Sequence, residues 1–401
     1  MSGASAAVGF ADILDPMPPE AFFAEHHGKK PLHIRGRPDK FARFMSWRKL
    51  NELLDMTAIW TSASLPMVLD GEVVPADRYC RPAIDRNNQH IMQPDPERVH
   101  MLLRQGASLV ANDIDTLTPD LAAAARAFEE ALGAKAQANL YCSWRERQAF
   151  AVHFDTHDVY AMHAEGEKVW RIYKGRLDTP IAHPRFKTLS RDYHEKAKGG
   201  VLMEVSLRPG DLLYIPRGQY HDALASSDGA VHVSFGLTSV IGIDYLTALF
   251  DRAIDDPLFR ATAPRPARDD GDDAIAAHLR LLAARLGEIA ASPEAIKQVR
   301  QFHRNFKYRR GGFDLPEAAT AARYRVRAKG LKVVRRGAGW SLEGKAGTVA
   351  IPPGGDRLVT WVIARERFSL PELDAAFPGQ TGEVRAQMLR DLVAMKVIEA
   401  V

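Results

Sequence analysis

A run of eight residues near the middle of the chain, HFDTHDVY (residues 153–160), brings together side chains that can bind a metal ion. The segment FAVHFD reads as a β-strand, on which alternate side chains share a face. His153 and Asp155 therefore point the same way, and Val152 and Phe154 point into the opposite layer. An imidazole nitrogen and a carboxylate oxygen from this pair could hold a divalent cation.

A third ligand must come from another strand, and the best candidate is His221. It follows GDLLYIPRGQYH, in which an apolar strand runs to Pro216 and Arg217-Gly218 breaks it. We therefore expect His221 at the end of that strand rather than in its middle. Two histidines and one carboxylate form the facial triad of non-haem Fe(II) oxygenases, which leaves coordination positions open on one side. Zinc suits the same donor set.

Lys168 is expected to place a cation close to this triad. Glu165-Gly166 is typical of a hairpin turn, so Lys168 returns beside the segment that carries His153. Its ammonium could hold the far carboxylate of a dicarboxylate whose near end chelates the metal. Tyr141 or Ser143, on the preceding strand, could add a hydroxyl hydrogen bond. The alternative is a surface lysine on a hairpin.

Four further polar residues lie near the proposed ligands in the sequence or on the expected strands. His157 and Asp158 are expected to be solvated turn residues or partners of the ligands. His163 and His232 fall on expected strands and read as core histidines, with His232 facing the barrel interior. Neither is expected to bind the metal, because a fourth protein ligand would close an oxygen site.

Residues 136–240 predict a barrel or sandwich of antiparallel strands. NLYCSW, FAVHFD, DVYAMHA, KVWRIYK, DLLYIPR and AVHVSFGL are short, β-branched and aromatic. Glu165-Gly166, Pro209-Gly210 and Asp228-Gly229 are turn pairs that separate them. This pattern favours the double-stranded β-helix of cupins. The N-terminal hundred residues look mixed, with an amphipathic helix around Trp47, and 119–132 reads as a helix ended by Gly133.

The strands stop after residue 243, and a helical region is expected over 244–304. Residues 263–273 are polar and proline-rich and read as a linker. An apolar stripe then follows at helical spacing: Ile275, Leu279, Leu282, Leu286 and Ile289. The stripe could pack against its own chain or form a helix–helix contact in a homodimer, and both readings stay open.

Residues 305–401 form a third unit that resembles a winged helix. Its first half is basic, with Arg309, Arg310, Arg323, Arg325, Arg327, Lys329, Lys332, Arg335 and Arg336. The end, from 383 to 401, reads as one helix with Val384, Met388, Leu392 and Met395 on one side. A regulator that binds nucleic acid through this unit, with the barrel as a sensor, is a second functional class. Arg385, Gln387 and Arg390 are too few to make specific nucleic-acid binding the expectation.

Composition sets the broad class. The chain has 401 residues, 46% of them hydrophobic, and a net charge of +4, which is ordinary for a globular protein of two or three domains. Two cysteines, Cys80 and Cys142, make neither a metal motif nor a disulfide framework, so a cytoplasmic location is expected. No secretory signal and no membrane span are expected.

The combination NLYCSW…HFDTHDVYAMHAEGEKVWRIY…GDLLYIPRGQYHDALASSDGAVHVSFGL resembles the JmjC-type cupins of the ribosomal oxygenase group. The opening HHGKKPLHIRG is similar to that family's entry segment. The resemblance implies an α+β protein: a JmjC cupin domain with an N-terminal α/β extension (1–243), a helical dimerisation region (244–304) and a winged-helix-like domain (305–401).

The resemblance also implies a function and a set of site residues. These enzymes are Fe(II)- and 2-oxoglutarate-dependent protein hydroxylases. By position, His153, Asp155 and His221 would bind iron, and Lys168 would bind the distal carboxylate of 2-oxoglutarate. The residues that match the segment lining the cosubstrate pocket are Asn139, Tyr141 and Ser143, and Trp170 matches a tryptophan read as core packing.

The substrate implied by the resemblance is an arginine or histidine side chain of a ribosomal protein. Two departures from the family lie near the mouth of the site: RERQAFAV (145–152) replaces a glycine-rich link, and His163 stands where many members have glutamine. They keep open a small molecule or a non-ribosomal peptide as substrate. A lysine demethylase shares the iron chemistry but is disfavoured, because the sequence has no chromatin-reading Cys/His zinc module.

Overall fold

The structure is a computed structural model. It describes residues 8–85, 88–144, 151–225, 229–265, 271–310, 323–337, 339–344 and 347–401. The chain forms two compact units, residues 1–311 and 312–401. The expected division at residue 243 falls inside the first unit, so the three-domain organisation stays a prediction.

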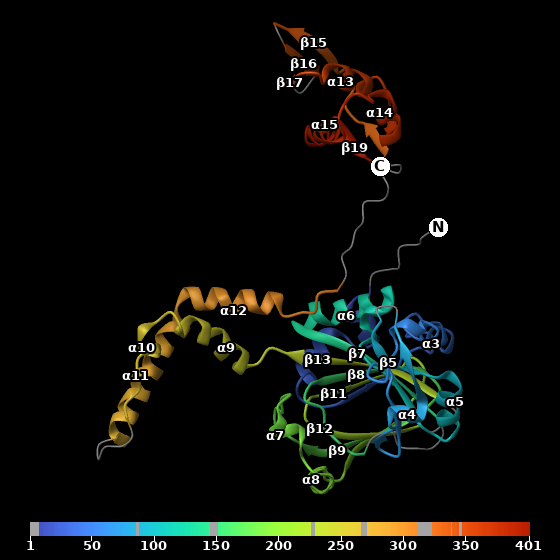
Figure 1. The fold of residues 1–401 in the computed structure, drawn as a ribbon, viewed down its shortest axis with the longest axis vertical. Coiled ribbons are helices and arrows are strands. Elements are labelled where there is room, and N and C mark those ends of the chain that lie inside the picture. Colours follow the sequence, from blue (N-terminus) through green and yellow to red (C-terminus); the bar gives the residue numbers. More distant parts are fainter. Residues whose placement is uncertain are drawn as a thin grey trace. The chain divides into compact units, whose positions relative to one another are not determined.

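An antiparallel sheet of eight strands forms the larger wall of the first unit (Figure 1). In spatial order its strands are β1 (Leu32–Ile34), β11 (Leu212–Ile215), β8 (Asp158–Glu165), β13 (Ala230–Ser239), β7 (Ala134–Ser143), β6 (Ser108–Ala111), β2 (Met67–Leu69) and β3 (Glu72–Val73). The expected strands around residues 140, 160, 213 and 233 are confirmed. The core of this unit lies between this sheet and the helices that cover it.

A second sheet of three strands closes the barrel from the other side. Its order is β10 (Val201–Leu207), β9 (Lys168–Arg176) and β12 (Gln219–Ala225). The sequence did not predict β10 or β12, because both carry polar residues such as Glu204 and Asp222. An apolar layer that includes Trp170, Ile172 and Leu213 fills the space between the sheets. The role of Trp170 as a core residue is therefore confirmed.

Helices and short connecting elements cover the large sheet and its ends. They are α1 (Phe10–Leu14), α2 (Pro19–Glu25), α3 (Trp47–Leu54), η1 (Thr57–Ile59), α4 (Ala76–Tyr79), β4 (Cys80–Ile84), β5 (His90–Pro94), α5 (Pro96–Arg104), η2 (Ile114–Thr116), α6 (Pro119–Leu132), α7 (Pro184–Lys187) and α8 (Arg191–Ala197). Helix α6 has the expected bounds. Thr118 caps its N-terminus, and Gly133 ends it with a φ of 60°, a conformation that favours glycine.

Four helices follow the barrel: α9 (Gly242–Ala253), α10 (Pro257–Arg260), α11 (Gly271–Ala291) and α12 (Pro293–Asn305). Helices α9, α11 and α12 contact one another beside the barrel (Figure 1). Of the expected linker, residues 263–265 lie outside any helix or strand, 266–270 lie outside the described residues, and the last three residues begin α11. On α11 the stripe residue Leu279 is 59% exposed, so the chain itself does not fully bury the stripe. In the described residues, no helix has the length and hydropathy needed to span a membrane.

The second unit combines two small antiparallel sheets with three helices. One sheet contains β18 (Arg367–Ser369), β14 (Arg323–Val326) and β19 (Ile398–Ala400), and the other contains β15 (Lys332–Arg336), β16 (Gly339–Gly344) and β17 (Gly347–Ile351). The helices are α13 (Asp356–Ile363), α14 (Leu370–Ala376) and α15 (Gly382–Ala394), and they share a core with both sheets.

The expectation of one helix from 383 to 401 is wrong. Helix α15 ends at Ala394, and Lys396 adopts a φ of 55°, which turns the chain out of the helix. Residues 398–400 then form β19, which pairs with β14 and buries Ile398. Met388 and Leu392 are buried as expected, whereas Val384 and Met395 are exposed.

Arg310 does not contribute to a basic surface of the second unit; it is buried in the first. Its guanidinium pairs with Asp115 at 2.9 Å and with Glu129 at 2.5 Å, and only 3% of its side chain is exposed. The same carboxylates accept backbone N–H groups of β7: Glu129 from Ala136 at 3.2 Å and Asp115 from Ala138 at 3.3 Å. The segment after α12 is thereby fixed to the start of β7.

We expect Arg310→Met to destabilise the first unit by about 3–5 kcal/mol, because it leaves two buried carboxylates without their cation. Urea denaturation followed by tryptophan fluorescence measures the free energy of unfolding. Arg309→Met is the matched control, since Arg309 is exposed, and should change stability by less than about 0.5 kcal/mol. Equal effects of the two substitutions would contradict the structural role of Arg310.

Candidate metal centre

His153 and Asp155 lie in an irregular segment rather than in a regular strand, so the expected strand FAVHFD is wrong. The segment makes one isolated bridge, in which the backbones of His153 and His221 exchange hydrogen bonds of 3.1 and 2.9 Å. The expected alternation of faces still holds. Val152 and Phe154 are buried in a small cluster with Tyr173 and Tyr220, on the side away from the two candidate ligands.

His221 is the third residue of β12. The sequence had instead suggested a position at the end of the apolar strand that precedes Arg217-Gly218. The polar strand is stabilised by specific partners. Asp222 accepts a hydrogen bond of 2.6 Å from the Tyr173 hydroxyl, and the Gln219 amide donates to the Tyr173 carbonyl at 2.5 Å. Strand β12 therefore begins directly after the Arg217-Gly218 break, and its pairing with β9 points His221 into the barrel.

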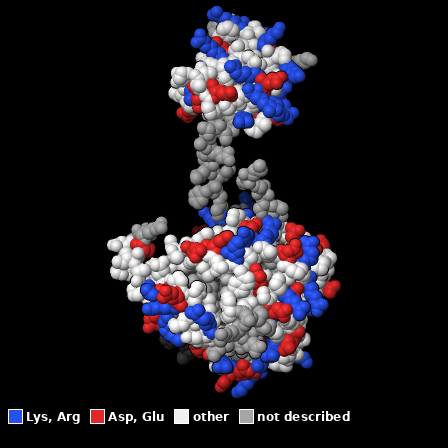
Figure 2. All heavy atoms as spheres, turned by 90° about the vertical axis from the view of Figure 1, so that its right-hand side faces the viewer, with Lys and Arg blue, Asp and Glu red and all other residues white. Residues whose placement is uncertain are grey.

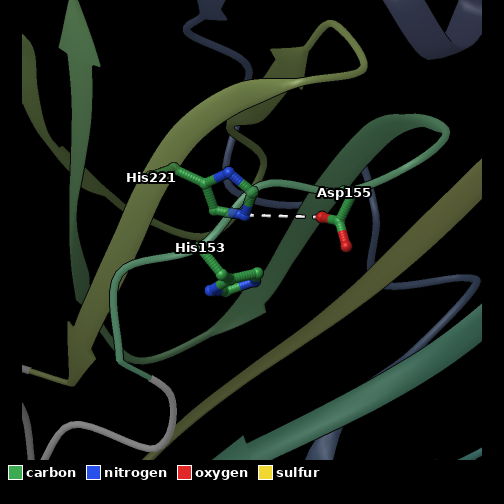
Figure 3. Close-up of side chains that lie close together, drawn as sticks. All are labelled: His153, Asp155 and His221. Carbon is green, nitrogen blue, oxygen red and sulfur yellow. Dashed lines mark ion pairs between the residues drawn. The ribbon is translucent and has the colours of Figure 1, made fainter. Parts of the chain in front are cut away.

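The three candidate ligands converge inside the barrel (Figure 3). One ligand atom each from His153, Asp155 and His221 lies within 4.8 Å of the other two. Nε2 of His221 lies 3.5 Å from a carboxylate oxygen of Asp155, and the two imidazole rings are 4.5 Å apart between centroids. These are separations that a single metal ion could bridge. No other group of this kind occurs among the described residues.

The hydrogen bonds of both histidines favour metal binding through Nε2. Nδ1 of His153 lies 2.8 Å from the Ala151 carbonyl, and Nδ1 of His221 lies 2.9 Å from the Gln219 carbonyl. A carbonyl only accepts, so each Nδ1 carries the proton and each Nε2 keeps its lone pair.

The charges of the site also suit a cation. Burial, with a smaller effect of His153, lowers the pKa of His221 to about 4, so its imidazole is neutral at pH 7. Burial alone would raise the pKa of the Asp155 carboxyl, but the neighbouring His157, His153 and His221 together lower it below its usual value. The cluster therefore offers one anionic oxygen and a neutral imidazole at neutral pH.

Lys168 lies inside the barrel beside this cluster, not on the surface. Gly166, with a φ of 67°, makes the turn between β8 and β9, so Lys168 begins β9 facing the cavity. Its side chain is buried, and its Nζ donates to the Ser143 hydroxyl at 3.2 Å, which in turn lies 3.0 Å from the Ser108 hydroxyl. Burial lowers the pKa of Lys168 to about 8.

One cavity of about 250 Å³ joins the candidate ligands to Lys168. Its lining contains Asn139 and Tyr141, as the sequence led us to expect, whereas Ser143 contributes through its hydrogen bond to Lys168. Asn139 also accepts a hydrogen bond of 3.1 Å from the backbone of Asp113. The assignment of these residues to a metal and a cosubstrate stays a prediction.

The remaining candidates divide between cavity and core. His157 lines the cavity and packs on Gly236, where a Cβ would lie 2.6 Å from its ring. Asp158 accepts a hydrogen bond of 2.8 Å from the backbone of Arg217. His163 lies behind the cavity with Nε2 2.9 Å from the Gly166 carbonyl, whereas His232 lines it.

The sequence did not mark Gln137, Val159, Ala223, Ser234 or Gly236, which also line the cavity. They become neighbours only because β8, β13 and β7 lie side by side in the large sheet and face β12 of the small sheet across the barrel. The alternation of residues along β13 places His232, Ser234 and Gly236 on one face, which is a signal that the sequence contains. Residues 145–150 of the segment RERQAFAV lie outside the described residues.

Residues 116–244 match the JmjC domain family. Curated relatives include "Bifunctional lysine-specific demethylase and histidyl-hydroxylase NO66" of Aedes aegypti, 27% identical over 53% of this chain and 32% of that protein. "Ribosomal oxygenase 1" of Bos taurus is 25% identical over 70% of this chain and 43% of that protein. The chain thus spans between a third and a half of the length of these relatives.

Among solved structures, E. coli ycfD matches over 96% of this chain and 98% of that chain, with a TM-score of 0.51 and 17% identity. At this identity the match shows the fold alone. It agrees with the mixed α+β architecture and with the cupin barrel. Residues 116–244 thus form a JmjC domain by sequence, and the chain is similar to curated ribosomal oxygenases at modest identity.

Proposed function

We propose that this protein is an Fe(II)- and 2-oxoglutarate-dependent oxygenase that hydroxylates a protein side chain. The observation that carries the proposal is the single cavity that holds His153, Asp155 and His221 at one place and the buried Lys168 at another. A two-histidine, one-carboxylate set is the donor set of non-haem Fe(II) oxygenases. Zinc would fit the ligands equally well, but it would leave the buried Lys168 ammonium without a function.

The residues of the chain divide the task between them. His153, Asp155 and His221 would hold the iron, and Lys168 would bind the distal carboxylate of 2-oxoglutarate, with Tyr141 and Asn139 lining the pocket. When bound, iron and 2-oxoglutarate supply the chemistry that uses O2 to convert a substrate C–H bond into an alcohol. The apolar layer around Trp170 and Ile172 excludes water from one side of the cavity.

The proposed substrate is an arginine or histidine side chain of a ribosomal protein. Support comes from the names of the relatives, which include a ribosomal oxygenase and a histidyl-hydroxylase. A small molecule or non-ribosomal peptide is the alternative. A demethylase activity, which one relative's name also includes, is ranked below hydroxylation.

The second unit is proposed to be a winged-helix-like domain. The side chains of its terminal helix, α15, do not favour specific nucleic-acid binding. Arg385 pairs with Asp374 at 2.7 Å, and Arg390 bonds to Gln387 on its own helix. On the face seen in Figure 2, acidic and basic side chains of this unit are interspersed. Arg327 and Arg336, for example, each pair with a glutamate at 2.6 Å.

A homodimer is the proposed assembly, formed through helices α9 and α11. Their exposed apolar side chains include Ile243, Leu246, Phe250, Ile254, Leu279 and Leu281. A second copy of the chain would bury these residues against their own equivalents, as an interface with twofold symmetry does. The free, buried Cys80 and Cys142 are compatible with the proposed cytoplasmic location.

The activity is tested by incubating the protein with Fe(II), 2-oxoglutarate, O2 and candidate ribosomal proteins. We expect succinate and a product heavier by one oxygen atom. His153→Ala should abolish both while leaving the fold in place, because the imidazole serves the ion rather than the core. His183→Ala is the control, since His183 is an exposed histidine outside the cavity. Full activity of His153→Ala, or oxygen gain without 2-oxoglutarate, would contradict the proposal.

The affinity for 2-oxoglutarate should fall as the pH rises. Burial lowers the pKa of Lys168 to about 8, so above that pH the free protein loses the charge that the carboxylate requires. Affinity should be level below about pH 7 and fall up to about tenfold per pH unit above 8. Calorimetry on Mn(II)-loaded protein measures this. Lys168→Met should bind weakly at every pH, and a level profile for the wild type would exclude the assigned role.

The dimer is tested by sedimentation of the wild type and of Phe250→Glu/Leu279→Glu. The double substitution places charges on the apolar helices and should convert the dimer into a folded monomer. Lys196→Glu, on the exposed side of α8, is the control and should remain dimeric. A monomeric wild-type protein would show that these helices do not form the interface.

A further inference from the structure

His232 is a buried polar side chain of the cavity that no step so far uses. It lines the cavity from β13 and is only 2% exposed. Within the part of the chain that the structure describes, its Nδ1 is buried without a hydrogen-bond partner. Because an unsatisfied buried polar group is costly, its presence calls for a physical reason.

Aromatic neighbours fix the orientation of this imidazole. It stacks on the Tyr141 ring at 4.9 Å with an interplanar angle of 8°, and it meets the edge of the Trp170 ring at 5.4 Å. Burial, with contributions from Lys168 and His163, holds the pKa of His232 well below its usual value. The ring is therefore neutral and offers one N–H and one lone pair.

His232 and Lys168 border the same end of the cavity. Tyr141 and Ser143 are two residues apart on β7 and so share a face. The ring of Tyr141 stacks on His232, which lies opposite it in the register of β7 and β13, and the Ser143 hydroxyl accepts from Lys168. The candidate metal ligands come from β12 and from the segment bridged to it.

We propose that His232 donates a hydrogen bond to the distal carboxylate of the cosubstrate, together with Lys168, and so selects a 2-oxo dicarboxylate over a 2-oxo monocarboxylate. This inference rests on the proposed function. The Lys168 ammonium is a compact charge with three N–H donors that can rotate toward the carboxylate. The stacked imidazole of His232 has one N–H donor, which points in one fixed direction. The pair therefore sets both the charge and the orientation of the bound carboxylate.

Two ligands separate this role from a general effect on the pocket. 2-Oxopentanoate has the carbon chain of 2-oxoglutarate but lacks the distal carboxylate. Calorimetry on the full-length, Mn(II)-loaded protein should show preference for 2-oxoglutarate. His232→Phe keeps the stacked ring and removes the donor. It should weaken 2-oxoglutarate binding by about tenfold or more, the effect of losing one hydrogen bond to a charged group, and should leave 2-oxopentanoate binding nearly unchanged.

Three further variants make the result decisive. His232→Asn retains an N–H donor and should keep most of the preference. His163→Gln changes the histidine behind the cavity and should bind both ligands as the wild type does. If His232→Phe does not fold, by circular dichroism, His232→Leu replaces it in the comparison with His232→Asn.

The inference is overturned if His232→Phe retains wild-type affinity for 2-oxoglutarate, or if it loses affinity for both ligands equally. A wild-type protein that binds neither ligand overturns the proposed function as well. If the wild-type protein binds 2-oxoglutarate but substitution of His232 leaves that affinity unchanged, only the inference about His232 is overturned.

Discussion

Two backbone hydrogen bonds between His153 and His221 are the constraint on which the metal centre depends. They hold an irregular segment against the well-paired strand β12 and bring two imidazoles from distant parts of the sequence to 4.5 Å between centroids. Each ring is then oriented by a carbonyl two residues before it. Asp155 needs no strand of its own, because its position follows from the anchored His153 two residues earlier. A short bridge can therefore position all three ligands.

The interior of the barrel is polar where function requires it and apolar elsewhere. Lys168 and His232 occupy buried positions where an aliphatic side chain would stabilise the fold more. The Ser143 hydroxyl, itself 3.0 Å from that of Ser108, accepts a hydrogen bond from Lys168, whereas Nδ1 of His232 has no hydrogen-bond partner among the described residues. Such incompletely satisfied groups are expected where a charged ligand completes the hydrogen bonding. The energetic cost of burying these groups and the proposed affinity for a dicarboxylate then have one origin.

The sequence predicted which polar residues meet in the cavity better than it predicted the backbone that positions them. The spacing of His153 and Asp155, the turn at Gly166 and the helix stop at Gly133 depend on local rules and were correct. Strand β12 escaped prediction because its polar residues Gln219 and Asp222 are satisfied by Tyr173 and Gly175, more than forty residues earlier. Arg310 was misread for the same reason: composition shows a basic run, whereas the carboxylates that bury it belong to a remote helix and turn.

The ion pairs of Arg310 connect the helical region to β7, the strand that carries Asn139 and Tyr141. Beyond β6, the outer edge of β7 has no strand partner for Ala136 and Ala138 in the described sheet, and carboxylates of Glu129 and Asp115 accept those N–H groups instead. Burial of those carboxylates is possible because Arg310 pairs with both of them. The residue that follows α12 thus stabilises the first half of β7, directly before Asn139 and Tyr141.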